Sequence, residues 1–440
     1  MPHANVTVNS PTLAHDAELI FRPGLEDSYS NSGTSKGAVY TQIQGDPVQV
    51  AEHLANQFAA TAPVRDAKGG TPKAERDALR ASGLLSLSIS KELGGLGANW
   101  VETLNVVRTL AVADSSIAHV FGFQHLHLAT VQLFGQAAQW KPWLTQTARK
   151  QWFWGNTLNP LDKRTVAVVQ GDHWEFSGKK SFTSGALDSQ MLVASAVDAR
   201  TGELLIAVLP TERAGITLLH DWNNMGQRQT DSGSALFERV RVEQDELLRD
   251  PGPLSTPYAC LRPLLAQLIF AHLFLGIAQG ALAQARNYTL YEAKPWFKSS
   301  ASVAAQDPHV LVHYGEFWTA LESARLLTEH ATHKFDAAWH RGHALTASER
   351  GEVAVAVTAA KIAASKAGLQ ITSQLFEVTG ARATHAALRF DRYWRNLRTQ
   401  TLHDPLHYKL QELGNLCISR QRMCLHMRAG CGSIPAYAAI

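Results

Sequence analysis

One short stretch combines an aromatic ring with two adjacent hydroxyl groups. Phe182, Thr183 and Ser184 follow one another between Gly178 and Gly185. Glycines allow backbone conformations and close approaches that other residues resist. A flat heteroaromatic ring needs such a set, because it requires one surface for stacking and polar groups for its edge. The flanking apolar runs indicate a strand, a turn and a second strand.

A Leu-His-Asp-Pro run near the end of the chain offers a second group that could take part in chemistry, His403. Asp404 followed by Pro405 is also typical of a helix start, because aspartate caps helices and proline fits the first turn. That interpretation accounts for Asp404 and Pro405 but leaves His403 unexplained. His125 and His127 could suggest a metal, yet nothing completes a ligand set, so we expect no metal site.

The composition is that of an ordinary globular chain. It has 440 residues, of which 45% are hydrophobic and 18% charged. The formal net charge of +3 is too small to make nucleic acid or a membrane surface the expected partner. Four cysteines without a C-x-x-C pair indicate reduced thiols, and no signal peptide is visible, so we expect a cytoplasmic protein.

The hydrophobic period changes along the chain and divides it into four parts. Residues 1–45, rich in Ser, Asn, Thr and Gly, are expected to form a mobile N-terminal arm. Residues 46–150 carry helical spacing, residues 151–250 alternate like strands, and residues 251–440 return to helices. Polar side chains interrupt the apolar stretch 264–285, which favours a buried bundle helix over a membrane span. The expected fold class is α+β and mostly α.

The run G-K-K-S-F-T-S-G-A-L-D-S at 178–189 resembles the flavin-side strand of the acyl-CoA dehydrogenase superfamily, which typically reads G-x-K-x-W-I-T-N-G-x-x-A-D. A second match covers residues 225–234, and the chain is most similar to the branch of flavin-dependent dibenzothiophene monooxygenases. The resemblance runs from about Asp46 onward. It implies the acyl-CoA dehydrogenase fold, with an N-terminal helical domain, a central β-domain and a C-terminal four-helix bundle, and it implies a homotetramer.

The same resemblance implies roles at the flavin. His403 would face the flavin and steady the peroxide formed at its C4a carbon, Ser184 would hydrogen-bond the flavin edge, and Asn156 would lie beside the reactive face. Phe182 and Trp222 would flank the ring. Turn formation is the alternative for Ser184 and Asn156, and β-domain packing is the alternative for the two aromatic residues. The expected cofactor-binding set is Phe182, Thr183, Ser184, Trp222, Lys294, Arg382, His403 and Asp404.

Two basic residues favour one flavin over another. By the resemblance, Lys294 and Arg382 fall where the family has phosphate contacts. Acyl-CoA dehydrogenases often have paired glycines near the second position, where an FAD diphosphate presses on the backbone. Arg382 suits a terminal phosphate instead, through bidentate hydrogen bonds. The sequence therefore favours FMN over FAD, with a plain surface position as the alternative for each cation.

Three residues are expected by resemblance to line the substrate pocket: His119, Phe123 and Gln400. A histidine within a helix is more often a core residue, which is the alternative for His119. Phe123 stands where the dibenzothiophene enzyme has a tyrosine, and Gln400 stands where it has a histidine. These differences favour an apolar sulfide and remove a group that would titrate near neutral pH.

The expected function is that of a two-component monooxygenase, which uses reduced FMN and O2 to oxygenate a small organosulfur compound, a sulfide to a sulfoxide or sulfone. A separate NAD(P)H-dependent reductase would supply the reduced FMN, because no nicotinamide-binding fingerprint is visible. An FAD-dependent acyl-CoA dehydrogenase is the alternative. However, no glutamate occurs between Glu377 and Glu412, where many dehydrogenases carry the catalytic base. A non-catalytic, DNA-associated flavoprotein is a second alternative.

Overall fold

Five helices precede the sheet in the computed structural model, which describes residues 45–419. They are α1 (Pro47–Lys68), α2 (Lys73–Ser82), α3 (Trp100–Ala113), α4 (Ser115–Phe134) and α5 (Ala137–Lys150). Asp114 caps α4 by accepting hydrogen bonds from the backbone N–H groups of Ser116 and Ile117. The mobile arm expected for residues 1–45 lies outside the described residues, apart from Gly45.

Seven strands form a single sheet within the described residues. They are β1 (Trp154–Thr157), β2 (Val166–Gln170), β3 (His173–Ser181), β4 (Met191–Asp198), β5 (Leu204–Pro210), β6 (Ile216–Leu218) and β7 (Ser234–Val242). The strand order is β1-β4-β2-β3-β7-β6, and β5 pairs with β4 in addition. The parallel pairing of β1 with β4 opposes Asn156 to Val193, and the backbone N–H of Asn156 donates to the Ser184 carbonyl at 2.9 Å, so β1 lies beside the turn that joins β3 to β4.

The rest of the described chain is helical. Its helices are α6 (Leu261–Tyr291), α7 (Pro308–Arg341), α8 (Ala347–Thr379), α9 (Asp391–Thr401) and α10 (Leu406–Ser419). Thr346 and Glu349 form the capping box that starts α8, and Gly380, with φ of 76°, ends it. Helix α6 is long and apolar enough to cross a membrane, but 94% of its most apolar window is buried inside the protein. Packing therefore explains its composition.

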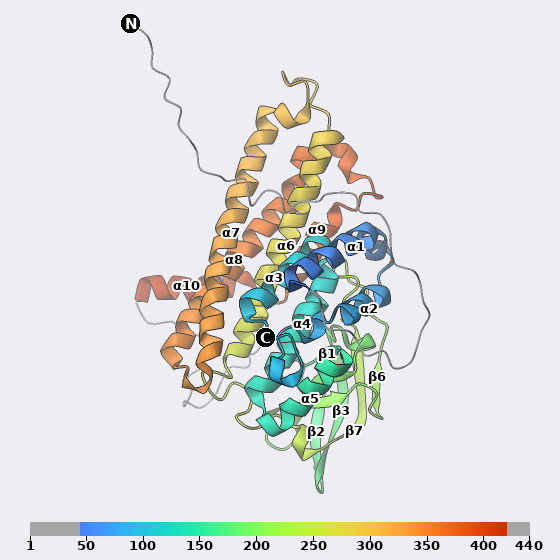
Figure 1. Cartoon of the computed structure of the whole chain (residues 1–440), viewed down its shortest axis with the longest axis vertical. Helices are drawn as coiled ribbons and strands as arrows, with labels where there is room; N and C mark the ends of the chain where they lie inside the picture. The colour runs from blue at the N-terminus through green and yellow to red at the C-terminus, as the bar shows by residue number, and fades with distance from the viewer. Residues whose placement is uncertain (1–44, 420–440) are drawn as a thin grey trace. The chain divides into compact units, whose positions relative to one another are not determined.

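Helices α3 and α4 lie between the bundle and the sheet (Figure 1). Helix α3 packs against α6 and α7, while α4 packs against α6 on one side and β1 on the other. Every residue of α4 except Gln132 is buried. This arrangement confirms the predicted fold class, α+β and mostly α, whereas the domain boundaries near residues 150 and 250 stay a prediction.

The contact between α3 and α6 depends on a glycine. A Cβ atom at Gly276 would lie only 2.5 Å from Ala111 Cβ and 2.5 Å from the Arg108 carbonyl oxygen. The two helices therefore approach more closely than any larger residue at position 276 allows. Gly315 in α7 offers a matched control, because a Cβ atom there would have no neighbour within 4 Å.

We expect Gly276→Ala to lower the free energy of unfolding by about 1–3 kcal/mol, because an added methyl group overpacks the α3–α6 contact. Gly315→Ala should instead raise it by roughly 0.5–1 kcal/mol, since alanine is the better helix former. Urea unfolding at one protomer concentration measures both changes. Equal effects of the two substitutions would contradict the close packing at Gly276.

Candidate functional site

The turn after β3 carries the residues predicted to hold the flavin. Phe182 adopts a left-handed backbone with φ of 62°, which turns its ring outward so that 57% of the residue is exposed. Trp222 lies beside it, with the two ring centroids 6.2 Å apart and the rings edge to face. Thr183 is buried and donates from Oγ1 to the Gly233 carbonyl at 3.0 Å. We call Asn156, Phe182, Thr183, Ser184 and Trp222 the turn group.

A chain of hydrogen-bonded hydroxyl groups determines the direction in which Ser184 donates its hydroxyl proton. Thr230 donates its hydroxyl proton to the Gln227 carbonyl at 3.0 Å, so Thr230 Oγ1 can only accept from Ser232, 2.7 Å away. Ser232 then has no proton left for Ser184, and the 2.7 Å contact between these two hydroxyls requires Ser184 to donate. The remaining lone pair makes Ser184 Oγ an acceptor for any further partner.

Asn156 holds the turn against the end of β1. Its backbone N–H donates to the Ser184 carbonyl at 2.9 Å, and its side-chain nitrogen donates to the Phe182 carbonyl at 3.2 Å. Its side-chain oxygen accepts from the Leu158 N–H at 3.3 Å. The structure thus brings Asn156 to the turn group, and its amide braces the backbone that presents Phe182 and Ser184.

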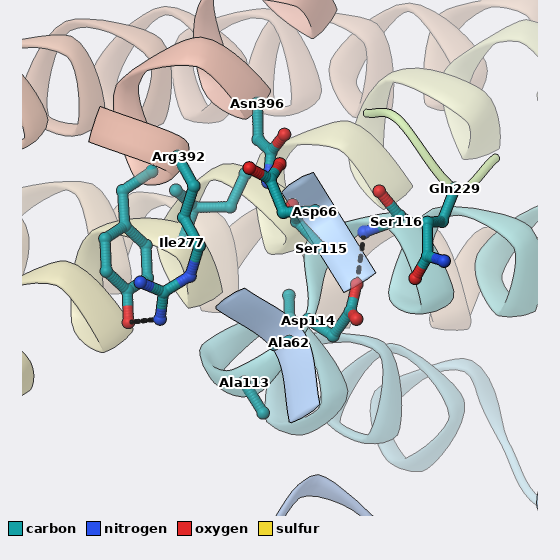
Figure 2. A pocket seen from close by; sticks show the side chains of 12 residues that line it. Ala62, Asp66, Ala113, Asp114, Ser115, Ser116, Gln229, Ile277, Arg392 and Asn396 are labelled. Carbon is teal, nitrogen blue, oxygen red and sulfur yellow. Dashed lines mark hydrogen bonds between the residues drawn. The ribbon is translucent and has the colours of Figure 1, made fainter. Parts of the chain in front are cut away.

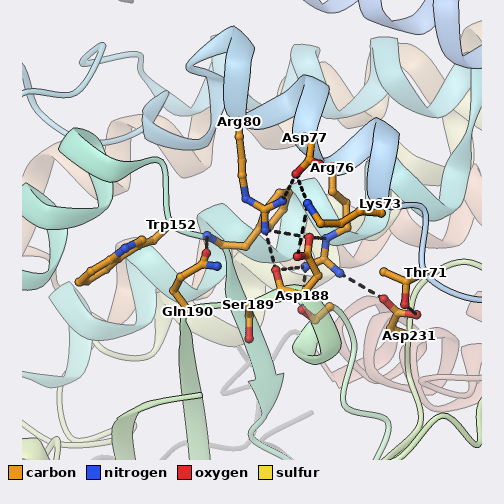
Figure 3. Close-up of polar contacts among 12 residues, drawn as sticks. Thr71, Lys73, Arg76, Asp77, Arg80, Trp152, Asp188, Ser189, Gln190 and Asp231 are labelled. Atoms are coloured by element: carbon orange, nitrogen blue, oxygen red, sulfur yellow. Dashed lines mark hydrogen bonds and ion pairs between the residues drawn. The ribbon is translucent and has the colours of Figure 1, made fainter. Parts of the chain in front are cut away.

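Two arginines of α2 tie the N-terminal helices to the same turn (Figure 3). Arg76, which is only 1% exposed, donates to the Gly185 carbonyl at 2.8 Å and pairs with Asp188 and Asp231, each at 3.2 Å. Arg80 pairs with Asp188 at 2.8 Å. Because one buried guanidinium engages both the 185–188 segment and Asp231, it fixes the two loops that meet at Ser184. No local sequence pattern marks these residues.

A second set of predicted residues meets around Phe270 of α6. We call His119, Phe123, Gln400, His403 and Asp404 the histidine group. The ring of Phe270 lies 5.9 Å from that of His119, 5.7 Å from that of Phe123 and 4.9 Å from that of His403. His119 stacks on Phe123 at 4.3 Å. The structure therefore brings together the three residues predicted for the substrate pocket and the predicted catalytic histidine.

Hydrogen bonding defines the tautomer of His119, and burial defines its protonation state. The Gln400 side-chain nitrogen lies 2.9 Å from His119 Nδ1, which assigns Nδ1 as the acceptor and leaves the proton on Nε2. Nε2 has no hydrogen-bond partner among the described residues. Burial, with a contribution from nearby His403, lowers the pKa of His119 to about 3. His119 is therefore a neutral ring with a free N–H donor.

Lys361 of α8 anchors the loop that carries His403, and the sequence analysis missed it. Its ammonium group, 1% exposed, pairs with Asp404 at 3.1 Å and donates to Gln267 Oε1. Burial lowers the pKa of Lys361 to about 8. His403 is exposed to solvent. Desolvation of its ring, and then the charge of Lys361, lower the pKa of His403, which favours the neutral imidazole.

Helix α4 connects the two groups. A Cβ atom at Gly185 would lie 3.1 Å from the Val120 side chain, and Val120 is the neighbour of His119. No hydrogen bond or ring contact among the described residues joins the turn group directly to the histidine group. Helix α4 therefore sets how far apart the two groups lie.

The predicted phosphate residues lie at the other end of the bundle. Lys294 follows the end of α6 and Arg382 follows the end of α8, and the two helix ends are tied by a hydrogen bond from Thr289 Oγ1 to the Val378 carbonyl at 3.0 Å. Both cations are exposed. At a rise of about 1.5 Å per residue, the end of α6 lies roughly 30 Å beyond Phe270. One chain therefore does not bring these cations to the histidine group.

A polar hollow at the start of α4 contains no member of either group (Figure 2). Its lining includes Asp66, Asp114, Ser115, Gln229 and Asn396, and none of the residues predicted for the site. Figure 2 shows Asp114 turned toward Ser116, whose backbone it caps at 2.9 Å. These polar groups serve the helix cap and the contacts between α1, α4 and α9, so we do not assign chemistry to this hollow.

Comparison with known families identifies the class of protein. The family model described as acyl-CoA dehydrogenase, N-terminal domain, matches residues 48–151, and the one described as acyl-CoA dehydrogenase, C-terminal domain, matches residues 268–408. Together these matches cover more than half of the sequence. The chain belongs to the acyl-CoA dehydrogenase family, which confirms the predicted resemblance.

Relatives with high identity to this chain include flavin-dependent monooxygenases. The chain is 67% identical to the probable FMNH2-dependent monooxygenase SfnC of Pseudomonas putida, over 85% of this chain and 95% of that protein. It is 63% identical to the solved structure of methanesulfinate monooxygenase MsuC from Pseudomonas fluorescens, with a TM-score of 0.86, covering 90% of this chain and all of that one. FMN-bound TdsC, a dibenzothiophene monooxygenase from Paenibacillus, is 40% identical, with a TM-score of 0.82 and coverage of 86% and 98%.

The buried histidines predict a stability that depends on pH. Burial lowers the pKa of His125 to about 3, against about 6.5 for the unfolded chain. The unfolded state therefore binds a proton first, and stability is lost as the pH falls from 6.5 toward 3. We expect His125→Gln to flatten this loss by up to roughly 1.4 kcal/mol per pH unit. Exposed His407→Gln is the control, and urea unfolding between pH 5 and 7 measures both slopes. Parallel curves for wild type and His125→Gln would contradict the assignment.

Proposed function

We propose that this chain is the oxygenase of a two-component system, which uses reduced FMN and O2 to oxygenate a small organosulfur compound. One observation carries the proposal. Asp404, the only carboxylate in the histidine group, is paired with Lys361. The neighbouring His403 has a lowered pKa, which favours its neutral form. An acyl-CoA dehydrogenase needs a free carboxylate to remove a proton from its substrate. A neutral imidazole instead suits oxygen chemistry, in which it can donate a hydrogen bond.

The turn group fits a flavin. The exposed phenyl face of Phe182 and the neighbouring indole of Trp222 offer stacking surfaces at the edge of the sheet. Ser184 Oγ is left as an acceptor, which complements an N–H group on the ring edge of a reduced flavin. When bound, reduced FMN supplies the two electrons that activate O2 and deliver one oxygen atom to the substrate.

The histidine group would complete the site on the substrate side. Phe123 and Phe270 would exclude water, and His403 would donate a hydrogen bond to the oxygen being transferred. The neutral Gln400 in place of a histidine predicts little change in rate between roughly pH 6 and 7.5. By this proposal the catalytic residues are His403, Ser184 and Asn156, with Asn156 acting through the turn that it braces.

The relatives support the substrate class. MsuC is named for methanesulfinate and TdsC for dibenzothiophene, and both compounds present a sulfur atom to the oxygenase. We therefore place this chain in organosulfur oxidation. We also propose a cytoplasmic location and a separate NAD(P)H-dependent FMN reductase as its partner.

We propose a homotetramer in which one protomer contributes Lys294 and Arg382 to the FMN phosphate bound by another protomer. Exposed apolar side chains gather on α7 and on the loop after α6, including Trp296 at 68%, Phe297 at 76% and Trp318 at 65% exposure. Such a surface is typical of a protein–protein interface. Lys294 and Arg382 lie near this loop and are too far from Phe270 in their own chain to hold the phosphate of the same FMN. A second protomer would bring them to it.

The direct test is turnover with NADH, FMN and a generic flavin reductase over sulfides, sulfoxides, sulfinates, phenols and indoles. We expect oxygenated product from at least one organosulfur compound, and its formation should require the reductase. Turnover of an acyl-CoA with bound FAD, in place of this activity, would support the dehydrogenase instead.

His403→Ala and Ser184→Ala should each lose at least about tenfold in product while NADH consumption continues, because oxygen activation would then end in hydrogen peroxide. Peroxide and product are quantified against NADH consumed. His407 is an exposed histidine four residues from His403. His407→Ala is therefore the control, and its product formation should stay coupled to NADH consumption. Full coupling in both variants would remove these residues from the mechanism.

Arg382→Ala should weaken FMN binding by about 1.5–3 kcal/mol, the cost of losing a charged hydrogen bond to phosphate. Fluorescence titration measures this against exposed Arg149→Ala, which should bind FMN normally. Riboflavin, which lacks the phosphate, should show no difference between wild type and variant. Light scattering that reports a stable monomer would refute the shared site. FMN binding by Arg382→Ala that is as tight as in wild type would refute it too.

A further inference from the structure

One buried lysine contacts both neighbours of the His403 ring. Lys361 of α8 is 1% exposed, and its ammonium group reaches α6, where it donates to Gln267 Oε1 and lies over the ring of Phe270, 5.8 Å from the centroid. The same ammonium group pairs with Asp404 at 3.1 Å, in the loop between α9 and α10. Lys361 therefore contacts the residue that follows His403 in the chain and also the phenyl ring on which His403 packs.

Two of these three contacts require the charged form of Lys361. A neutral amine can still donate a hydrogen bond to the amide oxygen of Gln267. It cannot balance the carboxylate of Asp404, and the face of the Phe270 ring no longer attracts it. Loss of the proton would therefore leave Asp404 without its counter-charge at a half-buried position, which is unfavourable until the carboxylate finds another partner.

A second cation lies within reach of Asp404. Lys409 of α10 is 3.9 Å from the Asp404 carboxylate and is paired with Glu412 at 3.4 Å. The Lys409 side chain is 21% exposed, against 2% for that of Lys361. Among the described residues, the side chains of the 402–405 loop form ion pairs with these two lysines alone. Asp404 therefore has one buried partner and one more exposed partner between which it can turn.

The position of the His403 ring depends on this loop. The backbone N–H of His403 donates to the Gln400 carbonyl at 3.1 Å, at the end of α9, and the ring lies 4.9 Å from that of Phe270. Within residues 45–419, no side-chain hydrogen bond or ion pair holds the ring itself. Because His403 and Asp404 are adjacent, a turn of Asp404 away from Lys361 moves the backbone that carries His403.

Lys361 loses its proton at a lower pH than an ordinary lysine. Burial lowers its pKa to about 8, although Asp404 opposes this shift, and Lys409 adds to it. The other titratable groups that face this region are His403, whose pKa is lowered to about 4, and Arg262 of α6, whose pKa of about 10 keeps it charged. Of the two buried cations, Lys361 is therefore the one whose charge changes between roughly pH 7 and 9.

We propose that Lys361 is a positioning residue for His403, whose protonated form keeps the 402–405 loop against α8 and whose deprotonation lets Asp404 turn toward Lys409 and withdraws His403 from the oxygen being transferred. This inference rests on the proposed function, in which His403 donates a hydrogen bond to that oxygen. A change of one charge would thus switch an element that has two arrangements. With His403 withdrawn, reduced FMN and O2 give oxidised FMN and hydrogen peroxide, in place of oxidised FMN, water and oxygenated substrate.

The first measurement is product formed per NADH consumed, between roughly pH 6.5 and 9.5, with FMN, a generic flavin reductase and an organosulfur compound that wild type oxygenates. We expect this ratio to fall at least about fivefold in wild type as the pH rises through about 8, with hydrogen peroxide formed instead. Lys361→Met keeps the length of the side chain without its charge and should show the low ratio at every pH.

Lys366→Met is the control, because Lys366 is exposed on the same helix, and its ratio should follow that of wild type. The dissociation constant of FMN should be the same in all three proteins. A Lys361→Met enzyme that is as coupled as wild type below pH 8 would overturn the proposal, as would a wild-type ratio that does not change with pH.

The second measurement needs neither flavin nor turnover. NMR of protein with ¹³C-labelled histidine follows the His403 ring, whose signal is identified by its loss in His403→Gln. We expect the signal to shift with an inflection near pH 8 in wild type and in Lys366→Met, and to lack that inflection in Lys361→Met. Because wild type alone shows the inflection, this measurement does not depend on the stability of a variant.

The two measurements separate this inference from the function on which it rests. A His403 signal that does not respond between pH 7 and 9 in wild type, or that responds equally in Lys361→Met, would overturn the role of Lys361. A Lys361-dependent inflection without oxygenation of any organosulfur compound at any pH would overturn the proposed function instead, and the link between Lys361 and His403 would stand.

Discussion

The candidate site depends on one buried interaction, the contact of Arg76 with the loops around Ser184. Its guanidinium reaches from α2 into the sheet, where it donates to the Gly185 carbonyl and pairs with Asp188 and Asp231. These partners lie far apart in sequence, so a single cation of α2 reinforces the contact between the 183–188 segment and the 230–233 loop, which also share backbone and hydroxyl hydrogen bonds. The hydroxyl chain that makes Ser184 an acceptor requires this contact. Loss of either carboxylate would leave this buried guanidinium with less compensating charge in the core.

Charge is distributed unevenly on the two sides of α4. The turn group presents hydroxyls and aromatic rings, while the histidine group contains neutral rings near two buried cations, Lys361 and Arg262. Lys361 is balanced by Asp404, and Arg262 is not balanced by any described carboxylate. Burial, and then the nearby positive charges, disfavour the protonated form of these histidines, which accounts for their neutral imidazoles.

Local signals in the sequence predicted most of the helices. Asp114 at the cap and the apolar run after it mark the bounds of α4, Ser115–Phe134, and the Thr346–Glu349 capping box marks the start of α8. Strand β1 shows no alternation, because all four of its residues are buried. The division into domains and the oligomeric state remain predictions, because neither depends on local sequence signals.

Only the site residues that match motifs of the family could be predicted from the sequence. Phe182, Ser184 and His403 were found in this way, but Arg76 and Lys361 were not. Each of these cations acts through a partner more than 40 positions away, and no local pattern reports that. The separation of Lys294 from Phe270 was also hidden, because it follows from the length of α6 rather than from either residue.

The central claim is that this chain transfers an atom of O2 to an organosulfur compound. The most direct measurement is mass spectrometry of the product formed under ¹⁸O2 in ordinary water, with reduced FMN supplied. We predict one labelled oxygen atom for each oxygen gained by sulfur. Product that carries only oxygen from water, or label that enters a ring carbon while no sulfur compound reacts, would contradict the account.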